Sequence, residues 1–209
     1  LCEQMSHAGA ETSPGAFAWF KLAGQDELLP MPDGVDPRAA ALAEPLAISL
    51  HALHQGGVEA GMRVMVMGAG PIGALAIAVM AQTGVAEVVC VEPAEVRRSL
   101  AVAVGATELR TPDELEVPSI AEPQRIVDGA CDVVIECSGA VAAMEAGLAQ
   151  LRPGAPLCTL HCVPQPRLGR AVGAARGLLR QRVQDQARVV VSEGGAAVGQ
   201  AGARAPACP

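Results

Sequence analysis

Three glycines at a fixed spacing are the residues of this sequence with the clearest chemical meaning. Gly68, Gly70 and Gly73 form the pattern G-x-G-x-x-G within GAGPIG. In such a turn the first glycine allows a tight bend, the second lets the backbone approach a pyrophosphate, and the third lets a helix pack close to its sheet. Pro71 suits the first helical position, where its missing N–H has no partner within the helix. The free N–H groups at that helix N-terminus attract phosphate oxygens.

An acidic residue completes the pattern. Glu92 lies 19 positions after Gly73, at the end of the next apolar run. A carboxylate there accepts hydrogen bonds from ribose hydroxyls and repels a 2′-phosphate, which predicts NAD rather than NADP as the cofactor. Arg97 and Arg98 leave the alternative open, because an arginine accommodates that phosphate; otherwise they form a solvated helix face. A glycine-rich turn that binds no ligand is the other interpretation of the motif.

A second polar turn follows a later apolar run. Glu136, Cys137, Ser138 and Gly139 come directly after DVVI. Loops at the carboxyl ends of strands border the cofactor crevice in sheets of this kind, so we expect this turn near it. An ordinary strand–helix turn in which Ser138 caps the following helix is equally compatible with the residues.

The elements that must position these residues alternate between residues 61 and 160. The strands lack polar alternation and are separated by helical stretches that end near glycines, which is typical of a parallel sheet covered on both faces. The fold class is therefore α/β, with a Rossmann-type doubly wound parallel sheet. We expect strands at 63–68, 87–91, 107–110, 132–136 and 156–160, and helices at 71–83, 94–104 and 141–151.

The residues before this region predict loops, one strand and a broken helix. The apolar stretch 16–22 favours a strand between two turn clusters. Asp36 is a good N-cap, with Pro37 at the first helical position. Pro45 interrupts the helical stretch 36–55, so we expect two short helices that meet near Glu44.

Composition limits the classes of protein further. Apolar residues make up 51% of the 209 residues, enough for a core, and no apolar run is long enough to span a bilayer. Residues 1–163 carry a net charge of −12, and residues 164–209 carry a net charge of +5. Because residues 1–163 are strongly acidic, we expect no nucleic-acid partner. Seven cysteines without a regular framework, and no signal peptide, predict a reducing, cytoplasmic location.

Six stretches of the sequence can be compared with known families: LCEQM (1–5), GAFAWF (15–20), LLPMPDGVDPRAAALAEPLAISLHAL (28–53), RVMVMGAGPIG (63–73), VVCVEP (88–93) and DVVIECSG (132–139). Together they resemble the zinc-dependent medium-chain dehydrogenases, in particular the branch of sorbitol, threonine and 2,3-butanediol dehydrogenases. The resemblance implies a Rossmann domain at 51–163, preceded at 1–50 by a remnant of a GroES-like, β-rich catalytic domain. The Arg/Ala/Gly tail at 164–209 departs from the family pattern.

The resemblance also implies roles for single residues. Cys2 matches the last of four cysteines that hold a structural zinc, and alone it cannot hold a metal. Glu44 matches a carboxylate close to the catalytic zinc or its water, and is thereby a candidate catalytic and metal-site residue; without the resemblance it is a solvent-exposed carboxylate at a helix break. Ile72, Glu92 and Arg97 match positions that contact the dinucleotide.

The activity implied for the family is hydride transfer between a secondary alcohol or polyol and NAD, with zinc as the Lewis acid. The sequence begins with Leu, and we expect the remaining zinc ligands to lie upstream of it. Cys158, His161 and Cys162 have no matching second pair of donors, so we interpret them as non-ligands. Because most of the metal site is missing, we expect this chain to bind the dinucleotide weakly and without turnover.

The change of charge and periodicity after residue 163 suggests that the tail is the translation of a shifted reading frame. For the chain as a whole, three alternatives to a zinc-dependent dehydrogenase stay open. They are a zinc-free reductase of the quinone-reductase type, a non-catalytic dinucleotide-binding module, and a fragment that does not fold because the sheet edge after Leu160 is incomplete. Neither the particular alcohol nor a homo-oligomeric state follows from the sequence.

Overall fold

The computed structural model describes residues 15–25, 28–118, 125–160 and 189–191. The chain divides into two compact units, one formed by Leu1–Ala43 with Gly195–Pro209 and the other by Glu44–Gly194. Among the described residues, every helix is too short or too polar to cross a membrane.

The described part of the first unit contains one short helix, α1 (Pro37–Ala40). Asp36 caps it as predicted, because its carboxylate accepts a hydrogen bond of 2.8 Å from the backbone N–H of Arg38. The predicted strand at 16–22 is wrong, since residues 15–25 form no strand. Side chains such as Phe17 and Trp19 are fully exposed. An extended segment becomes a strand only when a neighbour satisfies its N–H and C=O groups, and no described segment pairs with this one.

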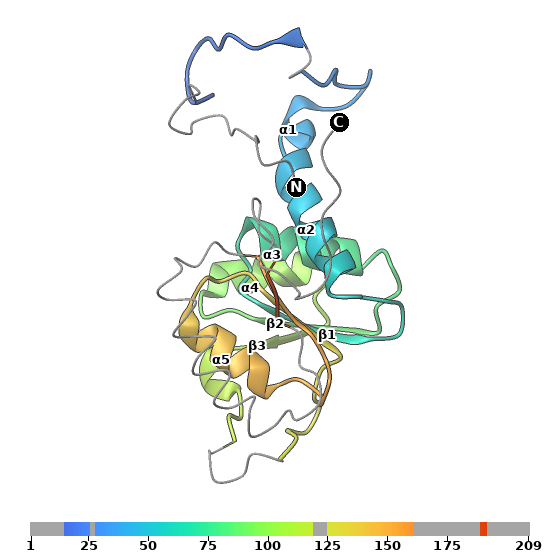
Figure 1. Ribbon diagram of the computed structural model, residues 1–209, viewed down its shortest axis with the longest axis vertical. Helices are drawn as coiled ribbons and strands as arrows, with labels where there is room; N and C mark the ends of the chain where they lie inside the picture. Colours follow the sequence, from blue (N-terminus) through green and yellow to red (C-terminus); the bar gives the residue numbers. More distant parts are fainter. Residues whose placement is uncertain (1–14, 26–27, 119–124, 161–188, 192–209) are drawn as a thin grey trace, which may run out of the picture. The chain divides into compact units, whose positions relative to one another are not determined.

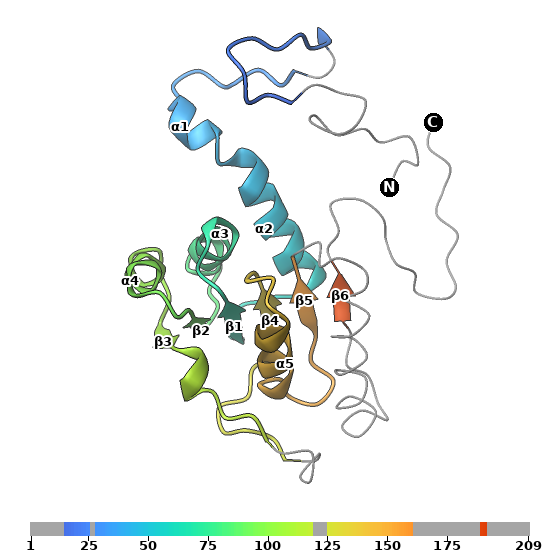
Figure 2. The same ribbon diagram turned by 90° about the vertical axis from the view of Figure 1, so that its left-hand side faces the viewer.

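The second unit is built on one parallel sheet (Figure 1), and Figure 2 shows its strands in the order β3-β2-β1-β4-β5-β6. The order reverses between β1 and β4, which makes the sheet doubly wound, as predicted. The strands are β1 (Arg63–Met67), β2 (Glu87–Val91), β3 (Glu108–Arg110), β4 (Val133–Glu136), β5 (Leu157–Thr159) and β6 (Val189–Val191). The helices are α2 (Ala43–Gln55), α3 (Pro71–Met80), α4 (Glu95–Ala103), the 3-10 helix η2 (Pro112–Glu114) and α5 (Val141–Ala149).

Both faces of the central strands are buried, which explains why β1, β2 and β4 are mostly apolar without alternation. Side chains of α2, α3 and α4, among them Ala52, Ile77 and Ala101, form one hydrophobic core with one face of the sheet. Met144 and Leu148 of α5 form a second core with the opposite face. Figure 2 shows α3 and α4 on one side of the strands and α5 on the other.

Most elements begin and end within one or two residues of the predicted positions, and three differences are more informative. The helix predicted at 71–83 ends at Met80, and a turn continues to Gly84. The break within 36–55 falls at residues 41–42, before Pro45, which lies in the first turn of α2 where the helix needs no N–H donor. The stretch around 188–192, for which the sequence shows no partner helix, contributes β6, and β6 pairs with β5 in parallel.

Candidate functional site

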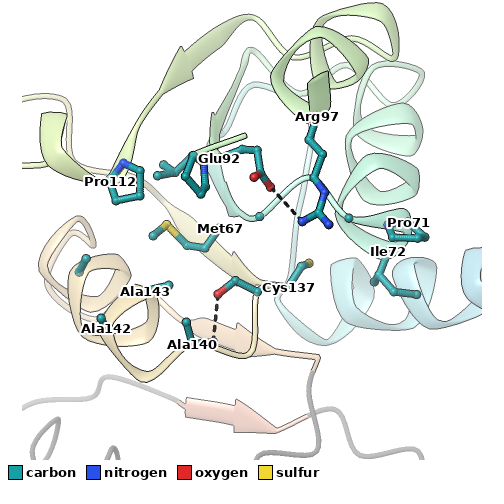
Figure 3. A pocket seen from close by; sticks show the side chains of 16 residues that line it. Met67, Pro71, Ile72, Glu92, Arg97, Pro112, Cys137, Ala140, Ala142 and Ala143 are labelled. Atoms are coloured by element: carbon teal, nitrogen blue, oxygen red, sulfur yellow. Dashed lines mark hydrogen bonds and ion pairs between the residues drawn. The ribbon is translucent and has the colours of Figure 1, made fainter. Parts of the chain in front are cut away.

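A pocket of about 600 Å³ lies at the carboxyl ends of β1, β2 and β4. Figure 3 shows that its walls come from the glycine turn and α3, from the segment around Glu92 and Arg97, and from α5. The lining residues are Met67, Gly68, Gly70, Pro71, Ile72, Val91, Glu92, Pro93, Arg97, Pro112, Cys137, Ser138, Ala140, Ala142, Ala143 and Ala146.

Two glycines of the G-x-G-x-x-G motif are required by the backbone itself. Gly68 has a φ of +99°, a conformation that residues with a side chain rarely adopt. A Cβ on Gly73 would lie 2.0 Å from the carbonyl oxygen of Gly68. The turn and the start of α3 are therefore packed too closely for any other residue at position 73, as the spacing predicts.

Gly70 differs from these two. It is the N-cap of α3 with a φ of −68°, and a Cβ placed on it would meet no atom within 4 Å. The protein itself therefore leaves room for a side chain at this position, which lines the pocket. A ligand that approaches the backbone here would explain why the position is glycine.

The carboxylate of Glu92 closes the pocket next to the glycine turn. Glu92 follows β2 and is only 2% exposed. Its Oε2 accepts a hydrogen bond of 2.9 Å from the N–H of Ala69, and its Oε1 accepts one of 2.9 Å from the N–H of Ala94. Each oxygen of an ionised carboxylate has a second lone pair. The carboxylate can therefore hold the glycine turn and still accept a hydrogen bond from a hydroxyl group in the pocket.

The two arginines after Glu92 have different surroundings. Arg98 donates hydrogen bonds to the carbonyl oxygens of Glu92 (2.9 Å) and Pro93 (2.6 Å), so it holds the loop between β2 and α4. The side chain of Arg97 is 61% exposed, and its Nη1 lies 3.9 Å from Oε2 of Glu92. Figure 3 shows these two side chains pointing toward each other at the pocket. Arg97 is thus the arginine that a bound phosphate could reach.

The turn after β4 borders the pocket, as predicted, through Cys137, Ser138 and Ala140. Ser138 is not the N-cap of α5, because Ala140 occupies that position without a side-chain cap. The hydroxyl of Ser138 instead donates to Oε1 of Glu136 at 2.5 Å and accepts from the N–H of Ala140 at 3.1 Å.

The buried thiols near this turn are poorly suited to act as nucleophiles. Burial, with the nearby charge of Glu136, raises the pKa of Cys137 far above its ordinary value. Burial also raises the pKa of Cys90 to about 12 and that of Cys158 to about 11. These groups stay protonated at neutral pH, whereas a nucleophilic cysteine must form the thiolate.

The other predicted site residues lie elsewhere. Gly73 is buried below the turn and does not line the pocket. Glu44 is exposed in the first turn of α2, outside the pocket lining. Cys2 lies outside the described residues. Within the part of the chain that the structure describes, no three His, Cys, Asp or Glu side chains come together to hold a metal ion.

The pocket also contains residues that the sequence analysis missed. Pro112 follows β3, and the rule that loops at strand ends border the crevice would have found it. Met67, the last residue of β1, lies at the floor of the pocket and reads in the sequence as an ordinary core residue. The alanines of α5 show no signal beyond helical spacing; they are Ala142, Ala143 and Ala146.

Comparison with known proteins gives consistent matches. Residues 71–165 match the family model described as "Zinc-binding dehydrogenase". L-threonine 3-dehydrogenase of Pyrococcus furiosus is 35% identical over 165 residues, which are 78% of this chain and 46% of that protein. Sorbitol dehydrogenase of Halalkalibacterium halodurans is 34% identical over 170 residues, 80% of this chain and 49% of that protein.

A solved structure gives a similar picture. A Sinorhizobium meliloti protein, whose crystal structure contains NADP, aligns with a TM-score of 0.60 and 26% sequence identity. The alignment covers 78% of this chain and 46% of that one. The chain thus spans about half the length of the relatives that it matches.

Proposed function

Since the chain belongs to the zinc-dependent medium-chain dehydrogenase family, we propose that its second unit binds the adenine dinucleotide NAD(H) in the pocket at the carboxyl ends of β1, β2 and β4. The contact between Glu92 and Ala69 is the observation that carries this proposal, because it places a buried carboxylate directly beside the glycine turn. A ribose hydroxyl and a pyrophosphate of one ligand would then occupy adjacent parts of the same pocket.

Each part of the ligand has a residue suited to it. The pyrophosphate would lie against Gly68, Gly70 and the N-terminus of α3, which begins at Pro71. The adenosine ribose would donate hydrogen bonds to Glu92. Ile72 and the alanines of α5 supply apolar surface, which is what most of a ligand pocket offers.

The preference for NAD over NADP rests on the charge of Glu92, which opposes a 2′-phosphate. Arg97 reduces this preference, because its guanidinium lies at the same end of the pocket. The Sinorhizobium meliloti relative contains NADP. We infer that NAD binds more tightly and that NADP binds measurably.

For the longer protein, we propose hydride transfer between a secondary alcohol or polyol and the nicotinamide. The names of the relatives, threonine and sorbitol dehydrogenases, support this substrate class. In this reaction the bound dinucleotide supplies or accepts the hydride. The residues of this chain bind and orient it through the glycine turn and Glu92.

The described residues do not fit a zinc ion. A structural site needs four donors and a catalytic site at least three with a water, and no such cluster is present among them. We assign no zinc-dependent step to this chain. Cys2, as a structural-zinc cysteine, and Glu44, as a carboxylate near a catalytic zinc, stay proposals for the longer protein.

Thermal unfolding with added cofactor tests the proposal. A ligand that binds only the folded state at about 100 times its Kd stabilises it by about 2.7 kcal/mol. We expect NADH to raise the melting temperature by several degrees and NADPH to raise it less. Nicotinamide mononucleotide, which lacks the adenosine, serves as the control and should have little effect. An unchanged melting temperature at millimolar NADH would contradict the proposal.

A further inference from the structure

Glu136, the last residue of β4, is a buried carboxylate that the proposed cofactor contacts leave without a role. It is 0% exposed and does not line the pocket. Its Oε1 accepts three hydrogen bonds, from the N–H of Ser138 (2.7 Å), the hydroxyl of Ser138 (2.5 Å) and the N–H of Gly139 (3.1 Å). Hydrogen bonds to an ionised acceptor are short and strong. One oxygen atom therefore fixes the whole turn after β4.

This turn lies directly against the glycine motif. A Cβ on Gly68 would meet the backbone N, the Cα and the Cβ of Ser138 at 3.2 Å. The N–H of Cys137 also donates to the carbonyl oxygen of Met67 at 2.9 Å. A displacement of Ser138 would therefore change the space around Gly68, where the pyrophosphate is proposed to bind.

The second oxygen of Glu136 is unusual because no described residue donates a hydrogen bond to it. Oε2 of Glu136 and the hydroxyl of Thr159 are both buried and have no hydrogen-bond partner among the described residues. Glu136 and Thr159 are register partners on β4 and β5, so their side chains lie on the same face of the sheet. A buried acceptor without a donor destabilises the fold. Core packing alone does not explain a carboxylate at this position.

We propose that Glu136 is a positioning residue of the dinucleotide site. Its carboxylate holds the Ser138 turn against Gly68 and so sets the shape of the bend that receives the pyrophosphate. This inference rests on the proposed function, because it assigns Glu136 to the same site. Thr159, the register partner of Glu136 on β5, carries the other buried polar atom without a hydrogen-bond partner among the described residues.

The test compares E136A with E136Q in the full 209-residue chain. Alanine removes all three acceptor contacts, whereas the carbonyl oxygen of glutamine can accept them and its NH₂ group can donate to Thr159. NADH affinity is measured by fluorescence titration, ADP and adenosine by competition against NADH, and stability by thermal unfolding. ADP carries the pyrophosphate and adenosine does not. The ratio of the affinities for ADP and adenosine therefore reports on the glycine bend that receives the pyrophosphate.

We expect E136A to weaken the binding of NADH and ADP by about tenfold or more, where each factor of ten in Kd corresponds to about 1.4 kcal/mol. The affinity of E136A for adenosine should change by less than about threefold. The affinity of E136Q for NADH should lie within about threefold of that of the unsubstituted chain. A purely structural role would lower the melting temperature of E136A while the folded protein bound NADH and ADP as before, and this result would overturn the inference.

A second variant covers the case in which E136A does not fold. S138A keeps the carboxylate and removes the hydroxyl that donates to it and that accepts from Ala140. We expect S138A to weaken the binding of ADP more than the binding of adenosine. An equal loss of affinity for both ligands would overturn the inference. If the unsubstituted chain binds no NADH, the proposed function fails and the inference fails with it. If that chain binds NADH and the E136A chain binds it equally well, the inference alone fails.

Discussion

Glu92 is the residue at which the geometry and the proposed chemistry of the site meet. Its two carboxylate oxygens join the glycine turn, through Ala69, to the loop after β2, through Ala94. The same carboxylate lines the pocket. A substitution of Glu92 would therefore affect stability and cofactor choice together. Arg97, which is largely exposed, offers a cleaner way to examine cofactor choice.

Replacing Arg97 by alanine is expected to weaken NADPH more than NADH. The guanidinium lies 3.9 Å from Glu92 and is the cation that a 2′-phosphate would reach. We expect the affinity for NADPH to fall by about threefold to tenfold and the affinity for NADH by less than about twofold, since Arg97 is exposed to solvent. Fluorescence titrations of R97A, with R38A as the control in the other unit, measure both. Equal losses for the two cofactors would show that Arg97 does not discriminate between them.

The glycines at positions 70 and 73 provide a matched pair of substitutions. G73A forces a Cβ to within 2.0 Å of the Gly68 carbonyl oxygen, so it should destabilise the fold by about 1–3 kcal/mol. G70A meets no protein atom within 4 Å, so it should keep its stability and lose NADH affinity. Urea unfolding and NADH titration of each variant separate the effects. Normal NADH binding by G70A would show that no ligand approaches the backbone there.

At the scale of elements, the sequence predicts the strands and helices whose formation depends on the spacing of apolar residues and on local composition. The strands β1, β2, β4 and β5 were predictable because a buried parallel strand is mostly apolar and has no polar alternation, whereas β3 carries Glu108 and Arg110 and is only half-buried. Contacts between distant segments were not predictable. The α5 wall of the pocket arises from packing against the sheet, and the stretch at 16–22 has strand composition but no described partner.

Charged residues at the amino ends of β1, β2 and β3, together with Arg110 at the carboxyl end of β3, form ion pairs that should make stability depend on pH. Arg63 pairs with Glu87 and with Glu108 (2.7 Å), and Arg110 pairs with Glu108 (2.6 Å). Although partial burial opposes the effect, the hydrogen bonds and charges of Arg110 and Arg63 lower the pKa of Glu108 from its ordinary value of 4.5.

A lowered pKa in the folded state means that Glu108 stabilises the fold above its ordinary pKa and loses this contribution as the pH falls through the folded value. We expect the free energy of unfolding to decrease below about pH 4.5 and to decrease less in E108Q. Urea unfolding at neutral and acidic pH measures this. E59Q is the control, because Glu59 is exposed and makes no ion pair within the described ranges. The same pH dependence in both variants would contradict the assignment.

At the scale of the whole molecule, the described residues form one parallel sheet with a pocket at the carboxyl ends of its strands, and the chain spans about half the length of the relatives that it matches. The pairing of β6 with β5 continues the sheet beyond the strand that the sequence places at its edge. Dinucleotide binding is therefore the function that we propose for this chain, whereas turnover of an alcohol is a proposal for the longer protein.

Cysteine alkylation tests whether the second unit is folded as described. Cys90, Cys131, Cys137 and Cys158 are buried, and burial raises the pKa of each. Iodoacetamide at pH 8 should therefore modify them much more slowly in native protein than in urea, because only the thiolate reacts. Mass spectrometry of the peptides identifies each site. Rapid labelling of Cys90 in the native protein would show that the sheet is not formed.

Isothermal titration of NADH into the 209-residue chain tests the central claim most directly. The account predicts saturable heat with a stoichiometry of one NADH per chain, and a clear loss of affinity in G70A, which keeps the fold. A well-folded chain, shown by slow alkylation of its buried cysteines, that gives no heat of binding with NADH or NADPH would contradict the claim that the glycine turn and Glu92 form a dinucleotide site.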